Sequence, residues 1–289
     1  MTSIHPPDAE KDIFYNIFQE ETMKITAAVS IAFAVLSVTT VARAESTELK
    51  TQTAKDIGLS LSAYQYEEPD VMSLQGVKMG LDLNATKVLQ NDRFIRGELR
   101  YAFGSVDYSS NGTGSASGNP DWYIEARGLV GKDWAIKDAV LAAYTGLGYR
   151  YLFNDGRGIT STGYAGYRRE SNYLYLPIGI IHRLALKDLA RLESTLEYDQ
   201  LLKGTQNTSL SDVGGGYSDV TNNQSRGYGL KLSIMYQKRN WAIGPYAHYW
   251  NIDQSDIVPE IQNGVPTGNG LMEPKNNTLE FGLKASQQF

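Results

Sequence analysis

The sequence closes with the stretch Leu279-Glu280-Phe281-Gly282-Leu283-Lys284-Ala285-Ser286-Gln287-Gln288-Phe289. Apolar side chains occupy alternate positions, and Gln287 is the one polar residue in the apolar phase. Side chains of a β-strand point to opposite faces in turn, so the stretch predicts a strand with one apolar and one polar face. An ordinary half-buried strand alternates in the same way, and the rest of the chain has to decide which kind of sheet this is.

The same alternation recurs along the chain. We predict ten strands, around residues 57–64, 77–86, 95–103, 122–130, 146–153, 173–180, 191–199, 228–237, 241–253 and 279–289. Segment 241–253 is apolar in both phases, so the pattern does not assign its faces.

The connections between these strands alternate in length. Long Gly/Ser/Asn-rich connections fall at residues 109–120, 154–172, 204–225 and 253–276, with a modest one at 67–74, and shorter ones fall at 89–92, 131–139, 185–188 and 238–240. A soluble sandwich would scatter its loop lengths over both ends. An even strand count with this parity predicts an all-β fold, a transmembrane antiparallel up-and-down β-barrel of about ten strands, closed because hydrocarbon offers no partner to a sheet edge.

The amino-terminal part predicts export. Met23-Lys24 precedes an uncharged apolar run from Ile25 to Val41, and Ala42-Arg43-Ala44 follows as a small-x-small cleavage site. These are the parts of a signal peptide over residues 23–44; a single membrane anchor is the competing interpretation, because the run is near the lower length limit for spanning. Residues 1–22 are acidic, the wrong sign for the start of a signal peptide, and we interpret them as a spurious upstream extension. The barrel then covers residues 45–289.

Composition limits the classes of function. The three basic and five acidic residues within 1–44 leave 24 Lys and Arg against 27 Asp and Glu, so no nucleic-acid partner is expected. There is no cysteine for a disulfide or a lipid anchor. The 19 Tyr and 28 Gly suit a barrel whose aromatic side chains gather at the two membrane interfaces.

The polar faces of the predicted strands place charges of both signs inside the barrel. The predicted lumen network consists of Arg96, Glu98, Arg100, Glu125, Arg127, Arg150, Arg191, Glu193, Glu197, Asp199 and Lys231. An ion-selective channel would show one sign in excess. Barrels of about eight strands are filled by side chains whereas 16–18 strands leave a channel, so a ten-stranded barrel favours a plug of ion pairs over a pore.

With these residues in view, the chain resembles the small Gram-negative outer-membrane β-barrel families of porin-like or adhesin-like kind. The resemblance rests on the Ala42-Arg43-Ala44 site, the ten amphipathic strands and the ending from Leu279 to Phe289. It implies the cell outer membrane as location, outer-membrane lipid and lipopolysaccharide as surroundings, and insertion by the barrel-assembly machinery. Phe281, Leu283 and Phe289 would then form the assembly signal, and Gln287 departs from it.

A hydrolase is the enzymatic alternative. Ala165-Gly166-Tyr167 with Glu170-Ser171 loosely resembles one signature of the omptin proteases, but the following residues diverge and the other omptin signature is missing. His248 is the one histidine that a hydrolase at the rim could use as a base. We interpret it instead as a member of an aromatic girdle with Tyr246, Tyr249 and Trp250, and His182 as a structural residue near the other end.

The sequence therefore predicts no catalysis, no cofactor and no metal site. Acidic residues of the long loops (Asp212, Asp219, Asp253, Asp256 and Glu260) are interpreted as solvated charge rather than a calcium site. The expected role is structural or one of surface interaction through the loops with an extracellular ligand that no motif identifies. A narrow porin-like channel for small solutes and an omptin-like hydrolase remain the alternatives.

Overall fold

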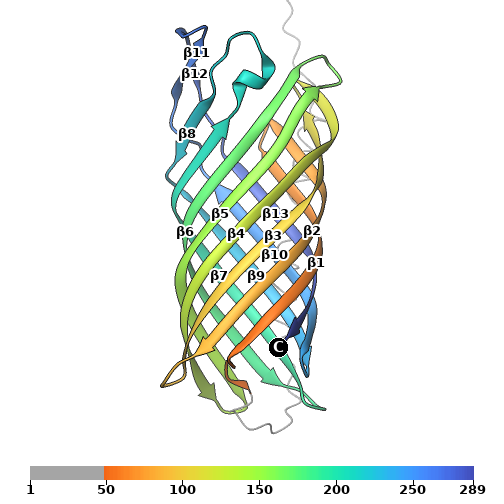
Figure 1. Cartoon of the computed structure of the whole chain (residues 1–289), viewed down its shortest axis with the longest axis vertical. Helices are drawn as coiled ribbons and strands as arrows, with labels where there is room; N and C mark the ends of the chain where they lie inside the picture. The colour runs from red at the N-terminus through yellow and green to blue at the C-terminus, as the bar shows by residue number, and fades with distance from the viewer. Residues whose placement is uncertain (1–48) are drawn as a thin grey trace, which may run out of the picture. The chain divides into compact units, whose positions relative to one another are not determined.

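The computed structural model describes residues 49–289, so the predicted upstream extension and signal peptide lie outside the described residues. Ten antiparallel strands form one closed barrel (Figure 1). They are β1 (Ala54–Glu68), β2 (Met72–Val88), β3 (Arg93–Ser110), β4 (Gly114–Ile136), β5 (Ala139–Ile159), β6 (Ala165–Ala185), β7 (Ala190–Thr208), β9 (Gly227–Lys238), β10 (Trp241–Ile252) and β13 (Asn276–Gln288). The predicted fold class is confirmed.

Neighbouring strands in the sequence are neighbours in the sheet, and the last strand pairs with the first. The register of the closing pair runs from Asp56 opposite Gln288 to Glu67 opposite Asn277. The backbone N–H of Phe289 donates to the carbonyl of Lys55 at 2.8 Å and extends this ladder by one more bond. Closure satisfies the edge hydrogen bonds that lipid cannot satisfy.

The two ends of the barrel differ in their connections. At the turn end, short links join β2 to β3, β4 to β5, β6 to β7 and β9 to β10. Asn91 and Asp92 both have positive φ in the first of these links, a conformation that Asn and Asp tolerate better than other side chains. The loop end holds the other connections, including the 3₁₀ turn η1 (Leu210–Val213), β8 (Val220–Gln224), β11 (Val258–Gln262) and β12 (Val265–Leu271).

Two predicted loops and one predicted turn are wrong. The turn was predicted at 131–139, but β4 runs to Ile136 and β5 begins at Ala139, so only residues 137–138 connect them. Residues 109–120 and 154–172 are for the most part strand, because β3 pairs with β4 up to Ser110 opposite Gly114, and β5 pairs with β6 up to Ile159 opposite Ala165. The strands continue past the membrane, where neither face has to be apolar. The backbone ladder persists there while the alternation that reveals it in the sequence disappears.

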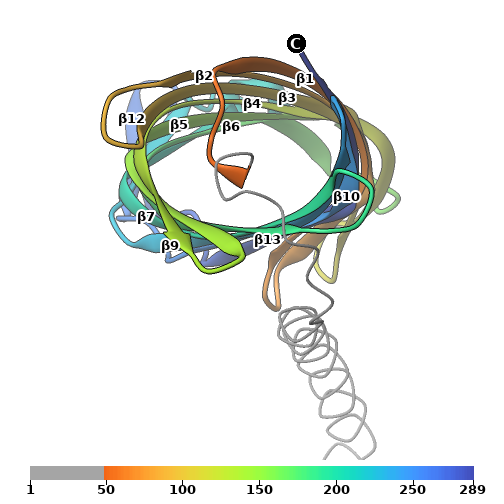
Figure 2. The ribbon, with the colours of Figure 1, turned by 90° about the horizontal axis from the view of Figure 1, so that it is seen from below.

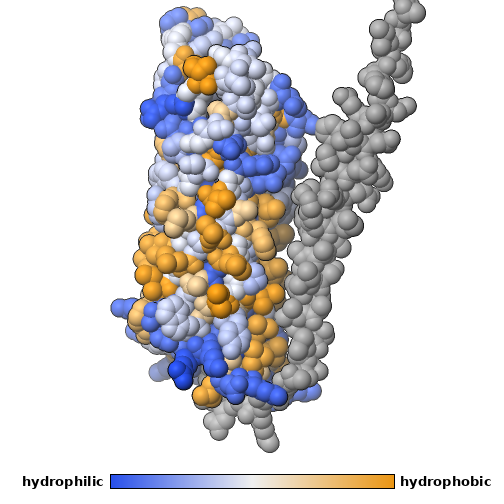
Figure 3. Space-filling view, turned by 90° about the vertical axis from the view of Figure 1, so that its right-hand side faces the viewer, coloured by the Kyte–Doolittle hydropathy of each residue, from blue (hydrophilic) through white to orange (hydrophobic). Residues whose placement is uncertain are grey.

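The outer face of the barrel carries the apolar side chains. Leu59, Leu61, Met79, Phe281 and Leu283 are each more than half exposed. Figure 3 shows an apolar band over the part of this face nearer the turn end, with hydrophilic surface beyond it towards the loop end. Stacked rings such as Trp122 on Phe153 belong to the same outer face. Within the described part of the chain, no helix is long and apolar enough to cross a membrane.

The segment before β1 enters the mouth of the turn end (Figure 2). Leu49 is buried against Val140 and Ala185. The backbone N–H of Thr51 donates to Asp133 at 2.7 Å, and its hydroxyl donates to the same carboxylate at 3.0 Å. This segment partly covers the opening that the short turns leave.

Candidate functional site

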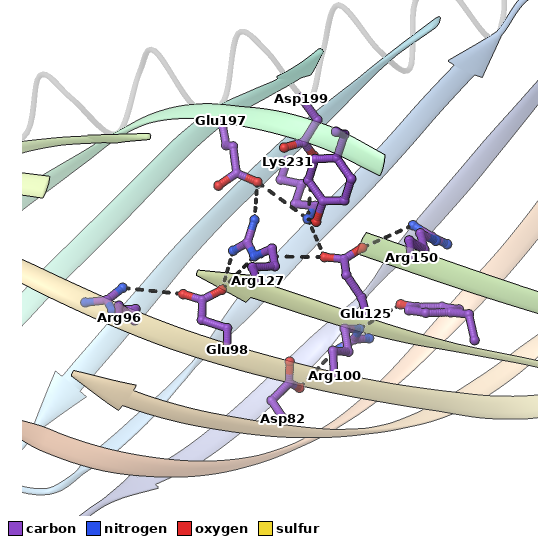
Figure 4. A network of polar contacts seen from close by, with 12 residues as sticks. Asp82, Arg96, Glu98, Arg100, Glu125, Arg127, Arg150, Glu197, Asp199 and Lys231 are labelled. Carbon is purple, nitrogen blue, oxygen red and sulfur yellow. Dashed lines mark hydrogen bonds and ion pairs between the residues drawn. The ribbon is translucent and has the colours of Figure 1, made fainter. Parts of the chain in front are cut away.

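Each residue of the predicted lumen network lies on the inner face of the barrel, and most of them form one continuous set of ion pairs (Figure 4). Arg127 on β4 donates from Nε to Glu98 on β3 at 2.8 Å and also pairs with Glu197 on β7. Glu197 accepts a second bond from the Tyr144 hydroxyl at 2.6 Å. Since β4 and β7 are not neighbours in the sheet, the Arg127–Glu197 pair crosses the lumen.

A second crossing pair lies beside the first. Lys231 on β9 donates to Glu125 on β4 at 2.5 Å and lies 3.5 Å from Asp199. Arg150 lies 3.8 Å from Glu125, and its guanidinium is 4.1 Å from the ring centroid of Tyr123. Glu125 therefore has two cationic neighbours, Lys231 and Arg150, and the ring of Tyr123 packs against the guanidinium of Arg150.

Arg100 forms the third crossing group. It donates to Asp82 on β2 at 2.8 Å, to Glu280 on β13 at 2.6 Å and to the hydroxyl of Tyr246 on β10 at 2.7 Å. The Tyr123 hydroxyl donates to the other oxygen of Glu280 at 2.6 Å. We call this set the plug, in which seven acidic and seven basic side chains meet. It is made of Lys78, Asp82, Arg96, Glu98, Arg100, Asp121, Tyr123, Glu125, Arg127, Tyr144, Arg150, Tyr175, Glu197, Asp199, Lys231, Glu280 and Lys284.

Tyrosines of the plug lie over glycines of the neighbouring strand. A methyl group added at Gly148 would lie 2.2 Å from Cζ of Tyr175, and one added at Gly179 would lie 2.2 Å from Cζ of Tyr144. The ring in each case occupies the space that a side chain at the glycine would need. Gly148 and Gly179 are therefore required for their small size, because any larger residue would collide with the tyrosine ring.

The predicted girdle of Tyr246, His248, Tyr249 and Trp250 is wrong in three of its four members. Tyr246, His248 and Trp250 point into the lumen, where the tilted rings of Tyr246 and His248 are in contact and Trp250 packs edge-on against Tyr175; Tyr249 alone faces outwards. Segment 241–253 is apolar in both phases because a tyrosine ring fills lumen volume while its hydroxyl reaches a buried carboxylate. The expectation that aromatics gather at the interfaces also fails for Tyr64, Tyr123, Tyr144, Tyr173 and Tyr175, which are buried inside the barrel.

The sequence analysis also missed charged partners. Lys78 pairs with Asp121, which comes before the strand segment that the alternation identified. Near the turn end Arg183 donates to Glu193 at 2.6 Å and to Asp133 at 3.2 Å. Arg191, of the predicted network, donates to Gln237 on the neighbouring strand β9 at 2.8 Å. Asp121 and Asp133 have no sequence signal as partners, since the strands that carry them do not follow the strands of Lys78 and Arg183 in the chain.

Two cavities flank the plug. The one on the turn side has a volume of about 220 Å³ and is lined mainly by polar side chains, among them Arg96, Glu193 and Lys284. The other lies at the loop end and has a volume of about 460 Å³. Its wall includes Met72, Tyr108 and Tyr167, and its charged residues are Glu68, Arg169 and Glu273. The plug separates these two spaces.

The residues of the predicted assembly signal lie on the outer face of β13 and just after it. Phe281, Leu283 and Phe289 are 59%, 61% and 72% exposed. Their side chains face the surroundings of the barrel while the backbone of β13 joins β10 to β1. The last strand therefore contributes both apolar surface and the closing ladder.

The acidic residues of the long loops are held by local hydrogen bonds. Asp212 accepts two bonds from the Arg168 guanidinium, at 2.8 and 2.9 Å, which lower the pKa of this carboxyl. Asp256 accepts from the backbone N–H of Asn223 at 2.6 Å, and Glu260 accepts from Thr267 at 2.7 Å. Among residues 49–289 no group of three or more acidic or histidine side chains is arranged to hold a metal ion.

The barrel is similar to solved outer-membrane proteins. The outer-membrane protease OmpT of Escherichia coli superposes with a TM-score of 0.56 at 10% identity, over 84% of this chain and all of that one. The translocator domain of the autotransporter NalP of Neisseria meningitidis gives a TM-score of 0.39 at 13% identity, over 83% of this chain and 90% of that one. No protein-family model and no curated protein matches the sequence. The likeness to OmpT shows the fold, that of the ten-stranded outer-membrane β-barrels.

Proposed function

We propose that this protein is a surface-interaction barrel of a Gram-negative outer membrane that presents its loop end to the medium and conducts no solute. The observation that carries the proposal is the plug. Its crossing pairs join β4 to β7, β4 to β9 and β3 to β13 in the middle of the lumen. A solute could pass only by separating buried ion pairs, and a buried charge left without its partner is strongly unfavourable.

The plug supports closure over ion selectivity. Each acidic side chain in it has a basic neighbour, as Asp82 has Arg100 and Asp121 has Lys78. A selective channel needs one sign of charge in excess along a water-filled path. Matched charges that fill the bore suit a barrel whose lumen serves stability, which leaves function to the loop end.

A narrow channel is the second candidate, and the cavity on the turn side favours it. That space of about 220 Å³ is polar and reaches Arg127 and Glu197 from below. Opening one crossing pair would connect it to the space above. In this alternative the Arg127–Glu197 pair is a gate.

Proteolysis receives less support from the site. The described histidines are His182 and His248, and neither is among the residues that line the loop-end cavity. His248 lies opposite Lys231 and Glu280 in the sheet register, inside the lumen. We therefore propose a protein without catalytic activity, whatever the activity of OmpT.

The location and the partners follow the same proposal. The apolar band would contact outer-membrane lipid, and the strand extensions beyond it would contact lipopolysaccharide. The barrel-assembly machinery would read the outer face of β13 with Phe281, Leu283 and Phe289. Residues 45–289 would form the mature barrel after cleavage behind Ala44.

Conductance of the refolded barrel in planar bilayers tests the closed lumen. We expect no stepwise current from the wild type, and a small current from the double variant Arg127→Ala/Glu197→Ala, which removes one crossing pair without changing net charge. Arg157→Ala/Asp155→Ala is the matched control, because it removes an exposed pair at the loop end. Wild-type currents like those of an open porin would refute the closed barrel in favour of the channel.

Protease treatment of whole cells tests the orientation. Cleavage should occur within residues 209–219 and 263–264 at the loop end and spare the turns at 186–189 and 239–240. Cleavage at those turns alone would place the turn end outside and contradict the proposal.

A further inference from the structure

The loop-end cavity has the size and wall of a small-molecule site. Its volume of about 460 Å³ falls in the range of roughly 300–1,000 Å³ that is common for ligand pockets. Aromatic and thioether side chains form much of its wall, among them Tyr108, Tyr164, Tyr167, Met72 and Met272. Such a wall suits the apolar body of an organic molecule.

Charged side chains gather at one place in this cavity. Arg169 on β6 donates to Glu68 at the end of β1 at 2.5 Å, and it also pairs with Glu273 just before β13. The Tyr66 hydroxyl lies 2.9 Å from an oxygen of each carboxylate. The side chains of Arg169, Glu68 and Glu273 are 10%, 5% and 7% exposed, so the cluster is largely out of water.

The cluster holds one negative charge in excess. Glu68 and Glu273 bring two carboxylates, Arg169 brings one cation, and no other Asp, Glu, Lys, Arg or His is among the residues that line the cavity. Both carboxylates accept the hydrogen bonds from Tyr66 and Arg169 through their Oε1 atoms. Burial and the neighbouring Glu68 raise the pKa of Glu273, as expected for an acid short of positive charge.

We propose that the loop-end cavity binds a small organic cation, an ammonium group on an apolar body, with the ammonium at Glu68 and Glu273. The body lies against Tyr108 and Tyr167, whose ring faces attract cations, and against the adaptable side chains of Met72 and Met272. A hard metal ion fits less well, because calcium takes six to eight oxygen ligands and this wall offers mostly carbon and sulfur. The inference rests on the proposed surface-interaction function and names the ligand class of that surface.

The contrast between a cation and its neutral isostere tests the proposal. Calorimetry on the refolded full chain in detergent would compare 2-phenylethylammonium with 2-phenylethanol, which has the same ring and chain without the charge. We expect the cation to bind roughly tenfold more tightly or better, since a hydrogen bond to a charged group is stronger than a neutral one. Equal affinities, or no binding of the cation, would overturn the proposal even where no variant is made.

Two variants and a control locate the site. Glu273→Gln and Glu68→Gln should each bring the affinity for 2-phenylethylammonium close to that for 2-phenylethanol. Glu260→Gln makes the same change on an exposed carboxylate of β11 outside the cavity and should leave it unchanged. An equal loss in Glu260→Gln, or displacement of the probe by calcium at the same concentration, would refute the site. The two proposals can fail separately. Conductance of the wild type would refute the closed barrel, whereas the difference in affinity between 2-phenylethylammonium and 2-phenylethanol tests the binding site alone.

Discussion

The plug and the loop-end cavity are built from the same kinds of residue and differ in how their charges are matched. In the plug, equal numbers of acidic and basic side chains meet across the lumen, and tyrosines fill the space between them. In the cavity, Arg169 serves two carboxylates and a space of about 460 Å³ remains beside them. Equal numbers of opposite charges, with tyrosines packed between them, close a barrel, whereas an excess charge next to a largely apolar cavity provides a binding site. The difference lies in stoichiometry and volume rather than in residue type.

The largest expected loss of stability comes from removing one partner of the ion pairs in the plug. Arg127→Ala leaves Glu98 and Glu197 without their main partner in a buried place, and we expect the barrel to lose roughly 3–5 kcal/mol of stability. Arg157→Ala, the same change in an exposed pair, should leave the stability nearly unchanged, because water screens such a pair. Urea unfolding in lipid vesicles measures both. Equal losses would mean that the plug is no more than another set of surface charges.

The next effect concerns the tyrosines rather than the charges. Gly148→Ala places a methyl group against the Tyr175 ring and should destabilise the barrel by about 1–3 kcal/mol, as overpacking does. Gly97→Ala is the matched control, because that glycine faces outwards on β3 and a methyl group there has open space. The same unfolding experiment compares them. If Gly148→Ala is as stable as Gly97→Ala, the rings are not seated as closely as the structure has them.

A smaller, pH-dependent effect should distinguish the cavity from the plug. The pKa of Glu273 is raised above its usual 4.5, so between 4.5 and the raised value the folded state keeps a proton that the unfolded state has lost. Stability from this group is present below pH 4.5 and is lost as the pH rises through the folded pKa. Arg169, Glu68 and Tyr66 are the groups that face it. Glu273→Gln should therefore gain stability relative to the wild type as the pH increases.

The matched control for this effect has the opposite sign. Hydrogen bonds from Thr267 and Asn269 lower the pKa of Glu260, so its contribution is present above pH 4.5 and is lost as the pH falls through the lowered value. Glu260→Gln should thus show no gain on raising the pH. Thermal unfolding followed by gel mobility over a pH series compares the two variants. A stability difference for Glu273→Gln that does not change with pH would contradict the excess charge.

The smallest effect is expected outside both regions. Asp212→Asn removes the anion that two guanidinium bonds hold at η1, in water, where such pairs add little. We expect unchanged global stability and faster proteolytic cleavage within residues 209–219, detected by mass spectrometry. Glu260→Gln again serves as the control and should leave that rate unchanged. A loss of stability as large as that of Arg127→Ala would remove the distinction between plug and surface.

The sequence by itself determined the class of fold, the strand order and the inner face of nine of the ten predicted strands, all but 241–253. Alternation along Leu279–Phe289 and nine other segments suffices, because the membrane imposes an apolar outer face on every strand that crosses it. The same rule places Arg127, Glu197 and Lys231 inside without any knowledge of their partners. Where the membrane ends the rule ends too, and for this reason residues 109–120 and 154–172 were predicted to be loops.

Only the tertiary structure decided which charges meet and which aromatics turn inwards. The alternation cannot tell a tyrosine at an interface from one like Tyr246 that reaches a lumen carboxylate, because its ring is apolar and its hydroxyl polar. The partners Glu68, Arg169 and Glu273 lie on separate strands, and closure of the sheet is what brings them to one cavity. Pairing across a barrel depends on register and curvature, which are properties of the closed sheet and have no local signal in the chain.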